Sequence, residues 1–354
     1  MARHHVTLAI ASHFDSIKKF LEPNLQSELL KRMKVAKKRQ VRATMTLVKI
    51  VRSLNSHDID VICMKGPSLS NLLFDDFAHR ESGDLDIMLH YKDLKRACVV
   101  LEELGYIESS GISFINLNET EFQAFLKIAS ELPFIPIDKS DFRIEIHWKT
   151  FAPESLYPFG YSEMLKNAQS MRVGDTTLNL MSDDHLLLYL CVHGAKHMWF
   201  RLGWLYDIHI YLKNRKGHID WNEQISVAKR NGIHRPLVQA VVMSHLLMDS
   251  DLPKEVELLY RSDRTIKKLV RNGMKAIGME ENRYNGMDAK NLIYMTLNLM
   301  GLKVGLRYKW DCISRLFISP QDWNILRLPT NLFMLYYFLR PFLFVIRRLK
   351  RLYQ

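Results

Sequence analysis

The chain has 354 residues, of which 47% are apolar and 25% charged, values typical of a globular protein with room for two or three domains. Its 50 lysines and arginines exceed its 38 aspartates and glutamates, which gives a net charge of +12. This excess suits phosphate-bearing ligands, nucleic acid or an anionic membrane surface, and does not choose among them. No stretch reaches eighteen uninterrupted apolar residues, so we expect no ordinary membrane-spanning helix.

The four cysteines are widely spaced and lie in apolar segments. Cys63, Cys98, Cys191 and Cys312 form no CxxC pair, so buried free thiols are favoured over disulfides or a zinc site. The apolar stretch that follows the N-terminus is too short for a signal peptide. Both observations favour a cytoplasmic location.

Residues 1–57 predict an N-terminal helical segment, and residues 58–180 a mixed α/β domain. Between 12 and 56, apolar residues recur at intervals of three and four among basic residues, the pattern of two amphipathic helices. Strand and helix signals then alternate, which is typical of an α/β arrangement. The expected elements are a strand at 59–64, a helix opening at Pro67, a strand at 84–89, a helix at 91–104, and strands at 113–117 and 142–148.

Residues 181–354 predict a helical C-terminal domain. Long patterns with helical periodicity dominate this part of the chain, and the boundary near residue 180 rests on that change. The expected helices cover residues 183–198, 204–213, 221–231, 236–248, 263–277 and 289–302.

Two carboxylates on the strand at 84–89 are the first candidate for chemistry. Side chains alternate between the faces of a strand, so Asp84 and Asp86 point the same way, while Leu85, Ile87 and Leu89 point into the core. Two adjacent carboxylates repel unless a cation lies between them, and hard oxygen ligands suit Mg²⁺ or Mn²⁺. We therefore predict a divalent metal at this strand.

A phosphate-binding element is predicted just upstream. Lys65 and Gly66 follow a predicted strand, and Pro67 and Ser68 open a helix whose free N–H groups can meet an anion. The Lys65 ammonium and the Ser68 hydroxyl are candidate contacts for a triphosphate, and Arg80 adds a second positive group.

A third carboxylate is predicted on the strand at 142–148. Glu145 and His147 share one face of that strand, and Glu145 completes a three-carboxylate set with Asp84 and Asp86. Such a set favours two metals, one at the phosphates and one at the acceptor hydroxyl. Glu145 is also a candidate general base, and the two roles stay open. His147 is interpreted as supporting the sheet or stacking on a base.

A histidine and lysine cluster lies in the predicted helix at 183–198. His193, Lys196 and His197 occupy one helical face at i, i+3 and i+4. We interpret this face as a contact for the nucleotide or the acceptor. A zinc site is not favoured, because no HExxH arrangement and no nearby third ligand are present.

Together these motifs resemble a largely uncharacterised nucleotidyltransferase family of the polymerase-β-like superfamily. The resemblance is carried over roughly residues 40–340 by Met64-Lys65-Gly66, Arg80, Gly83-Asp84-Leu85-Asp86, Leu104-Gly105-Tyr106, Glu145-Ile146-His147-Trp148, and His193-Gly194-Ala195-Lys196-His197 with 202–207. It implies an α+β fold, in which a small mixed sheet carries metal-binding carboxylates and is flanked by helices, with a helical C-terminal part. It also implies a magnesium-dependent enzyme.

The C-terminal segment at 332–346 is apolar and aromatic, and Arg347, Arg348, Lys350 and Arg351 follow it. It is too short and too interrupted to span a bilayer. Two interpretations stay open: peripheral contact with an anionic membrane surface, and a terminal helix packed on the helical domain.

The leading hypothesis is transfer of a nucleoside monophosphate from an NTP to an unidentified acceptor, with release of pyrophosphate. The alternative is a catalytically inactive nucleotide-binding or regulatory partner protein in a biosynthetic pathway, which the intact acids disfavour. Nucleic-acid binding through the basic N-terminal helices ranks third, because aromatic residues are not interleaved with the basic run.

Overall fold

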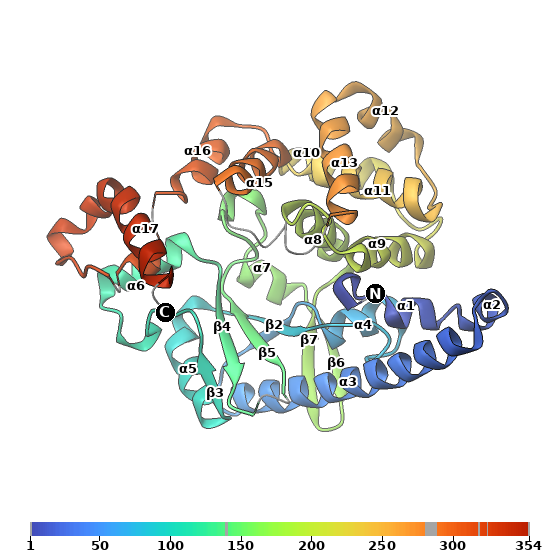
Figure 1. The fold of residues 1–354 in the computed structure, drawn as a ribbon, viewed down its shortest axis with the longest axis horizontal. Helices are drawn as coiled ribbons and strands as arrows, with labels where there is room; N and C mark the ends of the chain where they lie inside the picture. Colours follow the sequence, from blue (N-terminus) through green and yellow to red (C-terminus); the bar gives the residue numbers. More distant parts are fainter. Residues whose placement is uncertain (1, 139–140, 280–288, 318, 324, 353–354) are drawn as a thin grey trace.

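The computed structural model describes residues 2–138, 141–279, 289–317, 319–323 and 325–352. Within these ranges, strands form one mixed sheet in the order β3-β4-β5-β2-β1-β7-β6 (Figure 1). Its strands are β1 (Val61–Cys63), β2 (Asp84–Leu89), β3 (Tyr106–Glu108), β4 (Glu131–Pro136), β5 (Arg143–His147), β6 (Gln169–Val173) and β7 (Thr176–Leu180). At its centre β2 pairs antiparallel with β1 and parallel with β5.

Helices surround the sheet and make up most of the chain after residue 180. Those in the first part are α1 (Thr7–Ala11), α2 (Phe14–Ile17), α3 (Pro23–Asn55), α4 (Pro67–Phe74), α5 (Leu94–Glu103), α6 (Glu119–Ile128) and α7 (Tyr161–Lys166). Those in the second part are α8 (Asp183–Lys196), α9 (Leu202–Asn214), α10 (Trp221–Arg230), α11 (His234–Met248), α12 (Lys254–Ser262), α13 (Arg264–Ile277), α15 (Ala289–Leu302), α16 (Leu306–Ser314) and α17 (Tyr336–Leu352). Short 3-10 turns are η1 (Ala2–His4), η2 (Lys18–Phe20), η3 (Tyr91–Asp93), η4 (Phe114–Asn116), η5 (Glu154–Leu156), η6 (Pro320–Asp322) and η7 (Thr330–Leu335).

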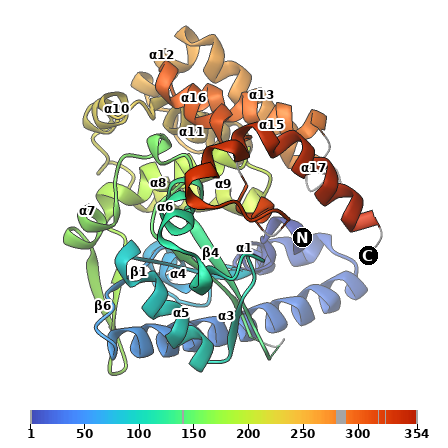
Figure 2. The ribbon, with the colours of Figure 1, turned by 90° about the vertical axis from the view of Figure 1, so that its left-hand side faces the viewer.

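Each face of the sheet carries its own apolar core. Leu85, Ile87 and Leu89 of β2 pack with α3 and α5, which lie below the sheet in Figures 1 and 2. Met88 of the same strand belongs to the core formed with α8, α9 and α11, above the sheet in the same views. The two-residue period of β2 therefore separates the cores, and it puts Asp84 and Asp86 on the side of α8.

Most of the predicted elements are present. The strands at 84–89 and 142–148, the helix at Pro67, and the C-terminal helices correspond to β2, β5, α4, α8, α9, α10, α11, α13 and α15. Two helices were predicted between 12 and 56, whereas the structure has the short α2 and one long helix, α3. The α+β class, with a mixed sheet flanked by helices and a helical C-terminal region, is confirmed. The domain limits at 57 and 180 stay predictions.

The strand predicted at 113–117 is wrong. Ser113 has a φ of 48°, and the segment forms the 3-10 turn η4. The Phe114 N–H donates to the Glu108 carboxylate at 3.0 Å, and the buried Phe114 ring packs against Phe122 and Phe125. These local contacts outweigh an alternation that has no adjoining strand to pair with in this structure.

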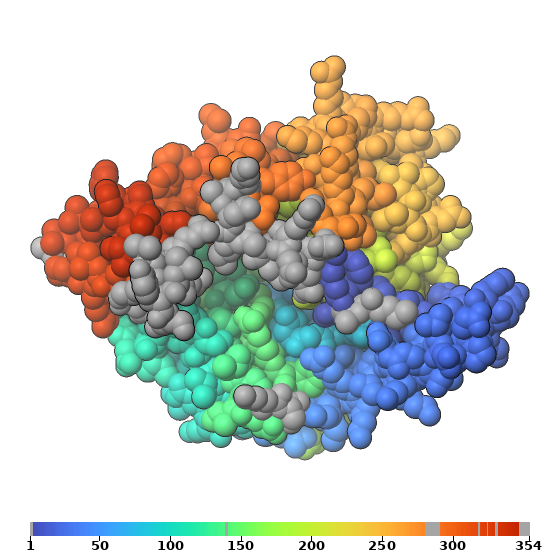
Figure 3. All heavy atoms as spheres, viewed as in Figure 1, coloured from blue at the N-terminus to red at the C-terminus, as the bar shows by residue number. Residues whose placement is uncertain are grey.

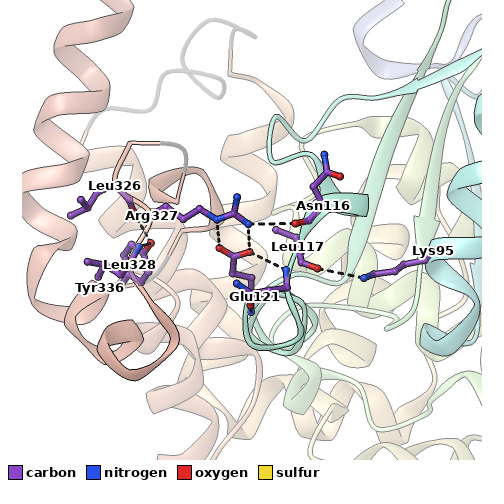
Figure 4. Close-up of polar contacts among 9 residues, drawn as sticks. Lys95, Asn116, Leu117, Glu121, Leu326, Arg327, Leu328 and Tyr336 are labelled. Carbon is purple, nitrogen blue, oxygen red and sulfur yellow. Dashed lines mark hydrogen bonds and ion pairs between the residues drawn. The ribbon is translucent and has the colours of Figure 1, made fainter.

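The C-terminal segment returns to the sheet domain and docks on α6. Arg327 donates two hydrogen bonds of 2.8 and 2.7 Å to the two oxygens of the Glu121 carboxylate, forming an ion pair (Figure 4). Tyr336 and Leu343 of α17 are buried in the core that includes α5 and α6. None of the described helices combines the length and the apolar content that crossing a membrane requires.

Candidate active site

The candidate acids come together because β2 and β5 are parallel neighbours. Asp86 lies opposite Glu145 in the register, and Met88 lies opposite His147. Alternate residues share a face, so Asp84, Asp86, Glu145 and His147 all lie on the side of α8. One ligand atom from each of Asp86, Glu145 and His147 lies within 4.8 Å of the others. Asp84 lines the same cavity without being part of this triple.

Asp86 is the most heavily contacted acid of the site. Its Oδ1 accepts from Lys65 Nζ at 3.0 Å and lies 3.1 Å from His147 Nε2, and its side chain is 1% exposed. Burial favours the neutral acid, but the Lys65 charge and the His147 hydrogen bond outweigh it and hold the Asp86 pKa below its ordinary value. Asp86 is therefore a fixed negative charge at the centre of the site.

The neighbouring acids are less well compensated. Burial, followed by the Asp86 charge, raises the pKa of Asp84. The same two causes, with the Glu131 carboxylate, raise the pKa of Glu145 to about 7. The nearby cations therefore do not fully offset the effects of burial and of repulsion between the carboxylates.

The donor set fits a divalent cation. Converging oxygens from Asp86 and Glu145 suit Mg²⁺ or Mn²⁺, and an imidazole donor is better tolerated by Mn²⁺. The His147 Nδ1 is buried without a hydrogen-bond partner, 3.7 Å from Glu131 Oε2. Burial lowers the His147 pKa, but the Asp86 hydrogen bond and the Glu131 charge outweigh it and raise that pKa overall, so ligation would require loss of a proton.

The Lys65-Gly66 element reaches the same cavity, but Ser68 does not. Gly66 precedes α4 with a φ of +68°, which glycine adopts without strain. A Cβ added at this position would lie 3.5 Å from the Asp84 carbonyl oxygen. The Ser68 hydroxyl is fully buried and donates to the Lys65 carbonyl at 2.7 Å. Ser68 therefore supports the turn and does not line the cavity wall.

Arg80 forms a buried ion pair with Asp207, a partner that the sequence motifs did not indicate. Its Nε donates to Asp207 Oδ1 of α9 at 2.8 Å, and both side chains are almost completely buried. The second oxygen, Asp207 Oδ2, is buried without a hydrogen-bond partner. This pair ties the segment before β2 to the helices above the sheet, with Arg80 at the edge of the cavity.

The predicted cluster on α8 forms part of the cavity wall. His193, Lys196 and His197 all line the cavity. Burial, followed by nearby lysine charges, lowers the pKa of both histidines well below the ordinary value, so their rings are neutral at pH 7. Trp204 lies against both rings, with centroids 5.0 and 5.4 Å away. This wall therefore offers aromatic surface as well as one cation.

These parts enclose a cavity of about 300 Å³, at the lower end of the range for ligand sites. The acids of β2 and β5 line one part of it, and Lys196 of α8 lines another part together with the rings of His193, His197 and Trp204. Figure 3 shows the C-terminal helices, in orange and red, above the sheet domain, in green and blue.

Sequence reasoning missed several further cavity residues, and three of them are ionisable side chains that come from separate segments. Glu131 comes from β4, Arg201 precedes α9, and His5 comes from the N-terminal turn. Neither His5 nor Glu131 belongs to a motif, so no local pattern marks them. Arg201 directly precedes the conspicuous segment 202–207, which was the one available signal.

Residues 3–8, here called the N-terminal strap, are fixed beside this cavity by several contacts. Arg3 donates to the carbonyls of Ala276 and Ile277 at 2.9 and 3.1 Å and lies over the Phe200 ring. The Glu81 carboxylate accepts from the first N–H groups of α1, at Thr7 and Leu8. His5 is thereby fixed as a wall residue rather than part of a free end.

Gly203→Ala should displace this N-terminal strap. An added Cβ would lie 2.7 Å from the His4 carbonyl oxygen, a backbone atom that cannot rotate away. We expect a loss of about 1–3 kcal/mol in the free energy of unfolding, as in other overpacked sites. Urea denaturation measures it, and Gly301→Ala is the control, because its added Cβ meets neighbours at ordinary distances of 3.5 and 3.6 Å. Equal stability of the two variants would contradict this close approach.

Comparison with known proteins bears directly on this site. The model of a family described as uncharacterised nucleotidyltransferase matches residues 1–249, well over half of the chain. The chain belongs to this nucleotidyltransferase family. The matched part contains the sheet, the N-terminal strap, and α8 to α11, and so every residue of the cavity. No curated protein matches the sequence significantly.

Proposed function

We propose that this nucleotidyltransferase moves a nucleoside monophosphate from an NTP to an acceptor hydroxyl and releases pyrophosphate. The observation that carries the proposal is the convergence of Asp86, Glu145 and His147 in a cavity that cations and aromatic rings also line. A donor set and positive groups in one cavity match a substrate that has a charged triphosphate and an aromatic base.

The proposed roles follow from position. Asp84, Asp86 and Glu145, with His147, would hold one or two divalent cations, Mg²⁺ or Mn²⁺. Such ions, when bound, neutralise phosphate charge and favour the ionised form of an acceptor hydroxyl. Lys65, Lys196 and Arg201 attract the triphosphate, and Arg80, with Gly66, shapes the approach beside β2.

In the proposed reaction, the acceptor oxygen forms a bond to the α-phosphorus while the bond to the pyrophosphate oxygen breaks. The hydroxyl proton leaves to a base, and Glu145 is the candidate if it is not a metal ligand. The neutral rings of His193 and His197, with Trp204, provide a surface on which the nucleobase of the NTP can stack. We also propose a cytoplasmic location, supported by four buried free cysteines.

The deciding experiment measures pyrophosphate release from each NTP with Mg²⁺ or Mn²⁺ and a panel of candidate acceptors. We expect turnover by the natural chain and only background turnover by Asp84→Ala plus Asp86→Ala. The matched control is Glu102→Ala plus Glu103→Ala, which removes two exposed acids from α5. Full activity of the first double variant would refute the mechanism.

The second candidate is a partner protein that binds nucleotide without turning it over. Calorimetry with the metal–NTP complex separates it from the enzyme: binding without turnover for any acceptor favours the partner protein. The retained acids favour the enzyme.

A further inference from the structure

The helix α17 presents two opposite faces with different surroundings. On one face Tyr336 and Leu343 are each 3% exposed and pack in the core with α5 and α6. On the other face the exposed fractions are 76% for Phe338 and 67% for Phe342, and Val345 continues the row at 55%; Met334, 68% exposed, lies just before the helix in the 3-10 turn η7. Spacings of four and three residues keep Phe338, Phe342 and Val345, here called the apolar stripe, on one side of the helix over about two turns.

The apolar stripe is held outward by the docking of the segment that precedes it. Tyr336 donates its hydroxyl to the Leu326 carbonyl at 2.6 Å and accepts from the Leu328 N–H at 3.0 Å (Figure 4). Arg340, on the docked side, pairs with both oxygens of Asp322 at 3.0 and 2.8 Å. The exposure of the apolar stripe therefore comes from a fixed orientation of the helix.

The charge of the same segment selects the partner. Arg347, Arg348, Lys350 and Arg351 follow the apolar stripe, in a chain with a net charge of +12. A second copy would bring equal positive charges together, whereas an anionic surface would neutralise them. The helix lies at the edge of the molecule (Figures 1 and 2). Two phenylalanine residues followed by basic residues give it the composition of an interfacial helix.

We propose that α17 is a peripheral membrane anchor that lays its apolar stripe into the headgroup region of an anionic lipid bilayer. The acidic headgroups meet the basic residues that end the helix, and the rings of Phe338 and Phe342 enter the boundary with the acyl chains. The docked face keeps the enzyme body attached to the helix. An acceptor carried on a membrane would then be brought near this enzyme.

The experiment is vesicle flotation with the full chain. We expect binding to vesicles of phosphatidylglycerol mixed with phosphatidylcholine, weaker binding as salt screens the charges, and little binding to phosphatidylcholine alone. Replacing the four basic residues with glutamine should weaken binding about 600-fold, at about fivefold for each residue near an anionic surface. Phe338→Ser plus Phe342→Ser should weaken it at least about tenfold.

The matched control is Leu258→Ser plus Leu297→Ser, which removes two exposed leucines, 67% and 56% exposed, from α12 and α15. Unfolding midpoints check that the variants remain folded, which the exposed positions of the two phenylalanines and the two leucines favour. Unchanged binding by the phenylalanine variant, or equal binding to phosphatidylcholine alone, would overturn the proposal. Self-association that needs the two rings, without binding to either vesicle, would instead assign the apolar stripe to contact between copies.

Discussion

Arg80→Met is expected to lower the free energy of unfolding by about 3–5 kcal/mol, the usual effect of removing one partner of a buried ion pair. Arg80 and Asp207 are 2.8 Å apart, and their side chains are 12% and 3% exposed. Without the guanidinium, Asp207 would keep a buried carboxylate with neither oxygen compensated, because Oδ2 already lacks a hydrogen-bond partner. Urea denaturation at neutral pH measures the loss.

A second substitution tests the cause of that loss. Adding Asp207→Leu to Arg80→Met removes the unpaired charge, so we expect most of the lost stability to return. A double variant as unstable as Arg80→Met would show that packing of the arginine stem, and not the orphaned charge, decides the outcome.

The pH dependence of the Arg80→Met variant should point the same way. Burial raises the pKa of Asp207, and the Arg80 charge opposes that rise. Without Arg80, the Asp207 carboxyl in the folded state keeps its proton at pH values where the unfolded state, with the ordinary pKa of about 3.9, has lost it. The free energy of unfolding therefore falls as the pH rises above about 3.9. A deficit that does not grow with pH would contradict this account.

The sequence was sufficient to predict the strand β2 and the shared face of its two carboxylates. Asp84 and Asp86 are recognisable because a strand has a period of two, so a pair at i and i+2 shares a face whatever the rest of the fold does. Glu145 joins them through the pairing of β2 with β5. The helix at Pro67 is similarly local, since proline suits a first turn and Gly66 permits the entry angle. Local rules of this kind survive folding.

Residues that reach the site through tertiary contacts were not predictable in this way. His5 and Glu131 arrive from an N-terminal turn and from β4, and their positions depend on how distant segments dock. The partner of Lys65 is another case, because its pairing with Asp86 follows from the antiparallel register of β1 and β2. Ser68 shows the converse. Its position at a helix start was correctly predicted, but its hydroxyl donates a hydrogen bond to the Lys65 carbonyl oxygen.

Lys65→Met is expected to destabilise the chain by about 3 kcal/mol or more in the absence of divalent ions. It removes the ammonium 3.0 Å from the Asp86 carboxylate, which then has His147 as its remaining charged partner. On the proposed function, turnover should also fall about a hundredfold or more, because a buried cation that would attract the triphosphate is lost. Lys37→Met is the control: its pair with Asp76 lies at 3.5 Å on exposed side chains, where such pairs contribute about 0–1 kcal/mol.

Divalent ions should distinguish the two roles of Lys65. In the natural chain the ammonium occupies the neighbourhood of Asp86 and competes with a cation for the same oxygen. In Lys65→Met that competition is absent, so Mn²⁺ or Mg²⁺ should raise the unfolding midpoint more than it does in the natural chain, by the linkage between ligand binding and stability. Adding Asp86→Asn should abolish the extra rise. If the ions raise both midpoints equally, they bind away from Asp86, and the acids of β2 and β5 would not be the metal centre.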